Sequence, residues 1–301
     1  MDLWIPFTLA AAFMQNTRSA LQRYLKDRLT TLGAAYVRFL YATPFAILYV
    51  WALHDIGGYP LPQPNAAFLV YTALGGLTQI LFTALLLYLF SFRNFAVGTT
   101  FSKTEVVQIA VLGFLILGDT VSLPALLAIL IALVGVIALS MEQTGISARR
   151  LLTGLKDRTT LVGLASGAFL GVSVVFFRGG ALSLGYDGFL MAAAYTLAVA
   201  LLMQTVAMGL YLALRETRTL VDVFVHWKWS LAVGAAGVLA SIGWFTAFTL
   251  ENGAYVRAVG QVELVFTFIS SHFFFKERST PREVAGILLI VASILILLLA
   301  V

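Results

Sequence analysis

The sequence has no cysteine and few charged residues, since only 11% of its 301 residues are Asp, Glu, Lys or Arg. Without cysteine there is no disulfide, no thiolate nucleophile and no Cys-ligated metal. Soluble domains carry roughly 25% charged residues, whereas hydrophobic residues make up 60% of this chain. One soluble core cannot hide so much apolar surface. The composition therefore excludes a soluble enzyme, a coiled coil, a disordered chain and a nucleic-acid-binding module, and favours a polytopic membrane protein.

Sequence signals for cofactors and catalysis are also missing. The three histidines, His54, His226 and His272, have no ligand-like spacing, so we predict no metal site. No Walker motif, Gly-rich phosphate loop or Ser/His/Asp set is recognisable. We therefore expect no cofactor, no ATP hydrolysis and no enzymatic activity. The formal charge of +5 is better explained by membrane topology than by nucleic-acid binding.

Long apolar runs dominate the chain. A bilayer core of about 30 Å requires about 20 helical residues, and the runs are continuously apolar rather than alternating, which favours helices over strands. The first run lacks the basic start of a cleaved signal peptide, so we expect it to be retained. The sequence predicts an all-α integral membrane protein with ten transmembrane helices: 3–24, 31–53, 66–90, 96–117, 123–141, 159–183, 188–214, 228–250, 255–275 and 281–301.

An internal repeat relates the two halves of the chain. Sliding the sequence by 158 residues aligns three polar pairs without a gap: Asn94 with Asn252, Glu105 with Glu263, and Asp119 with Glu277. Five spans per unit is an odd number, so the second unit enters the bilayer from the opposite face. We expect two inverted five-helix repeats, 1–141 and 159–301, joined by a linker over 142–158. Such repeats are typical of transporters that work by alternating access.

Two segments carry a likeness to a known family. They are 105-EVVQIAVLGFLILGDTVSLPALLAILIALVGVIAL-139 and 263-ELVFTFISSHFFFKERSTPREVAGILLIVASILIL-297. In each, a mid-helix Glu precedes a long apolar run, an acidic residue marks a turn, and a last apolar span follows. In this pattern the chain resembles the drug/metabolite transporter superfamily in its EamA-like ten-span form. The resemblance implies a cavity lined by spans one to four and six to nine, with spans five and ten as supports.

Two carboxylates are expected deep in the membrane. Counting residues from the span ends places Glu105 and Glu263 about 14–15 Å deep at 1.5 Å per residue. An ionisable group there costs roughly 2.5–3.5 kcal/mol, so each requires water or a partner. Either one binds a coupling proton, or both are structural and paired with Lys103 and arginines. Because Lys103 lies about 200° round the helix from Glu105, we expect Lys103 to pair with a carboxylate of another span.

Polar residues of the first two spans are candidates for a binding site. Gln15, Ser19 and Gln22 share a helix face next to Arg18, and Arg38 lies in the second span. Arginines in a wet cavity can bind an anionic or carboxylate group; alternatively, Arg18 packs against Glu105 in a purely structural role. The predicted substrate-binding set is Arg18, Arg38, Gln15, Ser19, Gln22, Lys103, Arg257, Gln261 and Trp244, with Glu105 and Glu263 for proton coupling.

The charge inside the spans favours an anionic cargo. Two carboxylates, Glu105 and Glu263, oppose a larger set of cations: Arg18, Arg38, Lys103, Arg178 and Arg257. This excess repels a lipophilic cation. We therefore predict a secondary active transporter for a small anionic or zwitterionic, amino-acid-like metabolite, with proton coupling as a further hypothesis. The alternatives are a multidrug or toxic-cation exporter, a lipid-linked substrate flippase and an intramembrane transferase.

Partners and location follow from the same reasoning. We expect a small-molecule substrate, the lipid bilayer and protons as partners, no nucleic acid, and a place in the bacterial cytoplasmic membrane. Basic residues gather in the loops after odd-numbered spans. The positive-inside rule then places both termini outside, whereas the resemblance implies both termini inside. The sequence thus supports two opposite orientations in the membrane.

Two further patterns concern helix packing. Gly163, Gly167 and Gly171 recur every four residues, which is typical of a small-residue ridge for close helix approach. Pro44 is expected to kink or loosen the second span, because proline removes a helical hydrogen bond.

Overall fold

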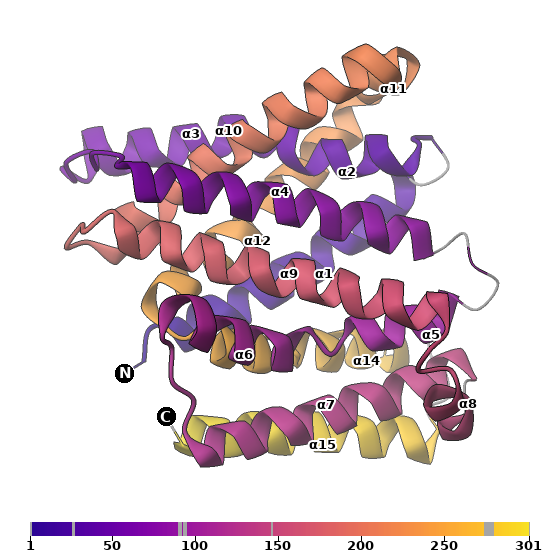
Figure 1. The fold of residues 1–301 in the computed structure, drawn as a ribbon. Coiled ribbons are helices and arrows are strands. Elements are labelled where there is room, and N and C mark those ends of the chain that lie inside the picture. Colours follow the sequence, from indigo (N-terminus) through magenta and orange to yellow (C-terminus); the bar gives the residue numbers. More distant parts are fainter. Residues whose placement is uncertain are drawn as a thin grey trace. The chain divides into compact units, whose positions relative to one another are not determined.

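The computed structural model describes residues 2–25, 28–89, 92, 95–145, 147–273 and 280–300, and the regular structure within them is helical (Figure 1). This confirms the all-helical prediction. The elements, of which η1 is a π-helix, are α1 (Trp4–Leu25), α2 (Thr31–Leu40), α3 (Thr43–Trp51), η1 (Ala52–Ile56), α4 (Ala66–Leu89), α5 (Phe95–Ser102), α6 (Glu105–Leu117), α7 (Leu123–Thr144), α8 (Ala148–Thr153), α9 (Arg158–Ser183), α10 (Phe189–Arg215), α11 (Thr217–Val225), α12 (Trp227–Leu250), α13 (Gly253–Gly260), α14 (Val262–Phe273) and α15 (Pro281–Ala300).

Eight stretches of the described chain are long and apolar enough to cross a membrane. The two further predicted spans are helical but do not meet that standard. In α1 the sequence 15-QNTR-18 lowers the hydropathy, and the 255–275 segment is interrupted between α13 and α14. The count of ten spans therefore stays a prediction. Leucines such as Leu115 and Leu299 are exposed on the outer faces, as expected for side chains that contact lipid.

The chain forms two compact units that each combine residues from both halves of the sequence. The first unit comprises residues 1–80 and 176–251, and the second comprises residues 81–175 and 252–301. Helices α4 and α9 contribute to both units. This division in space differs from the division into two sequence repeats.

In the first unit, α1 packs along α12, and α10 packs against α2, α3 and α12. Small residues allow the first contact, because a Cβ on Gly243 would lie 2.8 Å from the Cβ of Ala11. Buried apolar side chains from α2, α10 and α12 fill the interior, among them Phe39, Leu197 and Phe245.

In the second unit, α7 and α15 lie side by side (Figure 1). Their backbones meet at two glycines, since a Cβ on Gly135 would lie 2.9 Å from the carbonyl oxygen of Gly286. Leu139 and Ile290 are buried at this contact. The chain between α6 and α7 turns at Gly118, whose φ of 74° is a left-handed conformation that favours glycine.

Three predicted spans are interrupted helices. The second is divided into α2 and α3, with Pro44 in the first turn of α3, where a missing N–H costs little; this confirms the expected break. In the fourth predicted span, α5 ends at Ser102 and α6 begins at Glu105. The ninth predicted span is interrupted at Gln261, between α13 and α14. Both later breaks use backbone hydrogen bonds from residue i to i−3, namely Thr104 to Phe101 and Gln261 to Ala258, which is the tighter 3₁₀ geometry.

The predicted glycine ridge of α9 is a packing surface. A Cβ on Gly163 would collide with the backbone of Gly98 in α5, and one on Gly167 would lie 2.8 Å from the carbonyl oxygen of Ser102. One on Gly171 would lie 3.2 Å from the side chain of Ile109 in α6. The ridge therefore holds α9 close to the broken α5–α6 span, which confirms its packing role.

This contact makes a testable distinction between two glycines of one helix. We expect Gly167→Ala to destabilise the protein by about 1–3 kcal/mol, because backbone must move to admit the methyl group. Gly171→Ala is the matched control: its methyl group meets a side chain that can shift, and alanine favours the helix by about 1 kcal/mol. Thermal unfolding in detergent should give a lower Tm for the first variant only. Equal Tm values would contradict this account of the ridge.

Candidate functional site

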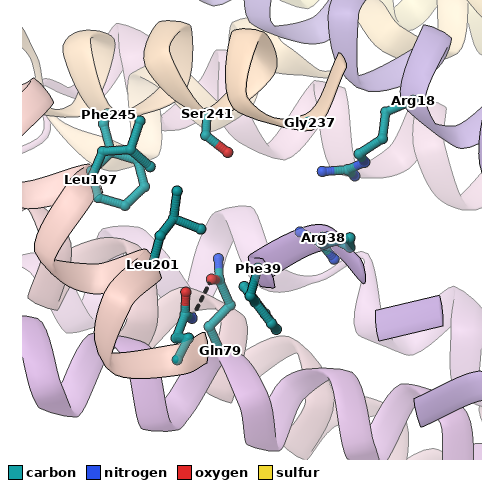
Figure 2. Close-up of a pocket in the computed structure, with 10 residues that line it drawn as sticks. Arg18, Arg38, Phe39, Gln79, Leu197, Leu201, Gly237, Ser241 and Phe245 are labelled. Atoms are coloured by element: carbon teal, nitrogen blue, oxygen red, sulfur yellow. Dashed lines mark hydrogen bonds between the residues drawn. The ribbon is translucent and has the colours of Figure 1, made fainter. Parts of the chain in front are cut away.

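A small polar cavity lies inside the first unit (Figure 2). Its volume is about 30 Å³, which is room for one or two water molecules. Side chains from five helices converge on it: Arg18 of α1, Arg38 and Phe39 of α2, Gln79 of α4, Leu197, Leu201 and Gln204 of α10, and Gly237, Ser241 and Phe245 of α12.

The cavity lining carries positive charge only. Among the described residues, the lining includes the guanidinium groups of Arg18 and Arg38 and no carboxylate. The described acidic residues of the first unit lie instead at helix ends or in short elements: Asp2, Asp55, Asp187, Glu216, Asp222 and Glu251. The structure thus brings together the two arginines that the sequence predicts as an anion site. In a region of low dielectric they strongly favour a negatively charged group between them.

Two glutamines form one wall of the cavity. The Gln204 side chain is buried, and its Nε2 donates to the Oε1 of Gln79 at 2.7 Å and to the carbonyl oxygen of Gly76 at 3.4 Å; Figure 2 shows the first bond as a dashed line. Sequence reasoning missed both glutamines. The sequence does contain a signal for them, because each is an isolated amide inside a long apolar run. A buried amide requires a hydrogen-bond partner.

Ser241 and Gly237 also escaped the sequence prediction. They lie one turn apart on α12 and face the cavity (Figure 2). A Cβ on Gly237 would lie 3.3 Å from the Cδ of Arg18. The absence of a side chain at this position therefore leaves space for the arginine to pass α12 and reach the cavity.

The remaining first-span predictions have mixed outcomes. Gln15 and Trp244 meet, because the indole Nε1 donates to the Gln15 Oε1 at 3.0 Å, and Trp244 stacks on Phe248. This contact joins α1 to α12 but is not part of the cavity lining. Ser19 is exposed and donates to the carbonyl oxygen of Gln15 in its own helix. The side chain of Gln22 lies outside the described residues.

The other predicted residues form a second polar cluster, in the second unit. Arg257 of α13 pairs with the buried Glu105 of α6, and it also interacts electrostatically with Glu263. The Nζ of Lys103 lies 3.9 Å from an Oε1 of Glu263. This confirms the expectation that Lys103 pairs with a carboxylate of another span. Gln261, also buried, donates to the carbonyl oxygen of Arg257. Two cations thus neutralise two carboxylates.

Each carboxylate of this charge cluster lies in the first turn of a helix. The sequence placed Glu105 in the middle of a continuous helix, and this is wrong: α5 ends at Ser102, and Glu105 is the first residue of α6. Glu263 lies in the first turn of α14, after the break at Gln261. Unpaired N–H groups at a helix start give it a partial positive charge that stabilises a carboxylate. The break therefore provides each glutamate with favourable backbone electrostatics as well as a basic partner.

Comparison with known proteins identifies the family of this chain. Residues 2–141 and 158–299 each match the EamA-like transporter family. The chain belongs to the EamA-like transporter family. One solved structure, described as "Crystal structure of protein", is similar over 99% of this chain and 97% of its own, with a TM-score of 0.72 and 14% sequence identity. Identity this low shows a shared fold alone. No curated protein matches the sequence.

The family match confirms the resemblance drawn from the Glu-containing segments and agrees with the prediction of a transporter rather than an enzyme. With its apolar helices, this EamA-like protein is an integral, multi-pass membrane protein. The two matched segments also confirm that the family unit occurs twice in the chain.

One arginine of this EamA-like protein caps the C-terminal end of a helix. Arg178 of α9 is half-buried, and its Nη1 donates to the carbonyl oxygens of Phe248 and Glu251 at 2.7 and 2.6 Å. The last carbonyl groups of a helix lack intrahelical partners. Arg178 therefore satisfies the end of α12, and it was not among the predicted binding residues.

The buried pair makes a prediction about stability. We expect Arg257→Leu to lower the free energy of unfolding by about 3–5 kcal/mol, because Glu105 would be left charged and buried. Adding Glu105→Leu should restore most of the loss. Equilibrium unfolding in mixed micelles measures both.

The matched control is Arg282→Ala, which breaks the pair with Glu142 at 3.6 Å. The Arg282 side chain is 85% exposed, so the cost should stay below about 1 kcal/mol. If Arg257→Leu costs no more than this control, the compensation described for Glu105 is refuted.

Proposed function

We propose that this EamA-like protein is a secondary active transporter that moves a small anionic or zwitterionic metabolite by alternating access. The observation that carries the proposal is the cavity whose described lining contains Arg18 and Arg38 and no carboxylate. Two half-buried guanidinium groups at one cavity favour an anion beside them, because guanidinium donors match the oxygens of a carboxylate. The same two charges argue against a cationic cargo, and hence against a toxic-cation exporter.

The small size of the cavity supports a conformational change during transport. At about 30 Å³ it is too small for a metabolite, since ligand sites usually measure roughly 300–1,000 Å³. The helices around it must therefore separate to admit cargo. We propose that they do so as two inverted repeats, 1–141 and 159–301, connected by residues 142–158, which gives an outward-open and an inward-open form.

Proton coupling is the second part of the proposal. Of the two candidate carboxylates, Glu263 is better suited to exchange a proton than Glu105. Glu105 is buried and directly paired with Arg257. Glu263 has a looser partner, with 3.9 Å to a Lys103 Nζ, and its side chain is 15% exposed. We further propose the bacterial cytoplasmic membrane as its location, with substrate and protons as its partners.

The arginines provide the decisive test of the anion site. A thermal-shift screen of purified protein against carboxylates and amino acids identifies a ligand. We expect Arg18→Ala and Arg38→Ala each to weaken its binding at least tenfold, with unfolding temperature of the free protein nearly unchanged. Arg218→Ala is the matched control, because this arginine is exposed in the same unit. Wild-type affinity in both cavity variants would refute the proposal.

Coupling is tested by flux in proteoliposomes. We expect Glu263→Gln to abolish acceleration of uptake by a pH gradient while leaving ligand exchange without a gradient intact, because the amide cannot bind a proton. Thr267→Val, one turn further along α14, removes a hydroxyl group and no charge, and it should respond to the gradient as wild type does. A gradient response that survives in Glu263→Gln would exclude this residue as the proton carrier.

A further inference from the structure

A second and larger hollow of the first unit, the α3–α10 groove, lies between α3 with η1 and α10. Its volume is about 320 Å³, against about 30 Å³ for the polar cavity, and this reaches the size of ordinary ligand sites, roughly 300–1,000 Å³. Its described lining is mostly apolar and aromatic and contains no Asp, Glu, Lys or Arg. We infer that the groove binds one acyl chain of a phospholipid whose headgroup carries a primary ammonium group.

The lipid bilayer has access to the groove. Ile47, Trp51 and Leu202 of the lining are about half exposed, and they belong to stretches that are apolar enough to cross a membrane. In an integral membrane protein, such side chains contact hydrocarbon rather than water. The membrane therefore supplies the occupant, which is a hydrocarbon chain.

The groove follows the direction of an acyl chain in a bilayer. His54 and Leu61 lie near or beyond the end of the apolar stretch 31–56, whereas Ile47 lies well within it. On α10, Tyr195 lies about 9 Å and Leu202 about 20 Å from the helix start, at 1.5 Å per residue. The lining thus extends from the membrane boundary towards the middle of the bilayer, so that a lipid with its headgroup at the boundary inserts its chain.

A π-helical turn forms the boundary end of the groove. After Trp51 the chain continues as η1, and the backbone N–H of Gly57 donates to the carbonyl oxygen of Ala52 at 3.0 Å, five residues back. Single π-helical turns are rare and are frequently found at functional sites. Here the turn includes His54, which is the most polar side chain of the described lining.

The polar groups at this end accept hydrogen bonds. The Nδ1 of His54 lies 2.8 Å from the carbonyl oxygen of Tyr59. Because a carbonyl oxygen cannot donate, Nδ1 carries the proton of the neutral ring, and Nε2 is an acceptor. The exposed carboxylate of the next residue, Asp55, also accepts. An ammonium headgroup brings three N–H donors to these acceptors, and the indole face of Trp51 attracts a cation as well.

The charge at this end favours an ammonium group over an anionic headgroup. Residues 52–65 after α3 and residues 184–200 around the start of α10 contain no Lys or Arg, and their charged residues are Asp55 and Asp187. In α9, Arg178 donates to two carbonyl oxygens at the end of α12. Two carboxylates attract the ammonium group of phosphatidylethanolamine and repel the net negative charge of phosphatidylglycerol.

Two lipids that differ only in the headgroup test the inference. Full-length protein in detergent is titrated with dioleoyl phosphatidylethanolamine and with dioleoyl phosphatidylglycerol, and bound lipid is counted by native mass spectrometry. We expect one saturable phosphatidylethanolamine, bound at least threefold more tightly than phosphatidylglycerol, because the chains are equal and only the first headgroup carries an ammonium group.

The same substitution at two positions of α10 tests where the chain lies. Val199 lines the groove, and Val199→Trp should weaken phosphatidylethanolamine binding at least tenfold, because the indole takes up the space. Val206→Trp is the matched control: it lies two turns further on the same helix face, is 60% exposed and is outside the described lining. Its affinity should stay within twofold of wild type. Leu202→Trp, at a half-exposed position of the lining, replaces Val199→Trp if that variant does not fold.

A further substitution tests the headgroup. Asp55→Asn removes the carboxylate and nearly keeps the shape of the side chain, and we expect the two lipids then to bind with about equal affinity. Asp222→Asn is the control, because this residue belongs to α11, beyond the other end of α10. It should retain the preference for phosphatidylethanolamine.

Each failure has its own result. The inference is overturned by the absence of a saturable lipid, by equal or tighter binding of phosphatidylglycerol to the wild-type protein, or by equal affinities of the two tryptophan variants. A dimer that dissociates in Val199→Trp would show that a second copy of the chain fills the groove instead of a lipid. The inference does not rest on the proposed transport function, whose anion site is tested separately by Arg18→Ala and Arg38→Ala.

Discussion

The structure depends on how charges are compensated where water is scarce. A charged group inside a membrane protein is costly unless a counter-charge or dipole lies close by. The second unit meets this requirement from within, since Glu105 pairs with Arg257 and Glu263 lies near Lys103. In the first unit, Arg18 and Arg38 line a cavity whose other described lining residues are neutral. The second unit thus holds a paired charge cluster, whereas the first unit gathers two arginines at one cavity, which we propose as an anion site.

Helix breaks make the internal compensation possible. A continuous helix would bury Glu105 in its middle, with its backbone N–H groups already bonded. Interruption after Ser102 places the carboxylate at a helix start, where free N–H groups favour negative charge. The second half of the chain repeats the device with Glu263 after Gln261. Discontinuous helices, whose half-helix N-termini favour negative charge, recur in transporters.

The two sequence halves are interwoven rather than set apart. Each compact unit takes residues from both halves, so that segments of the two halves meet: α7 lies beside α15, and α6 lies beside α13. This explains why each glutamate finds its basic partner in the opposite half. A unit built from one half alone would contain the carboxylates without those partners.

The sequence by itself determined the helical class, the positions of the apolar runs, the family and the types of polar residue inside the membrane, because these follow from composition, periodicity and the repeat of Glu105 at Glu263. Only the tertiary structure decided which residues meet. It placed Arg18 and Arg38 at one cavity and Glu105, Glu263, Lys103 and Arg257 in a separate cluster. It also moved Glu105 to a helix start and added Gln79 and Gln204 to the cavity wall. The physical reason is that partners such as Arg257 and Glu105 are far apart in sequence, and helix periodicity specifies a face but not the neighbour that it contacts.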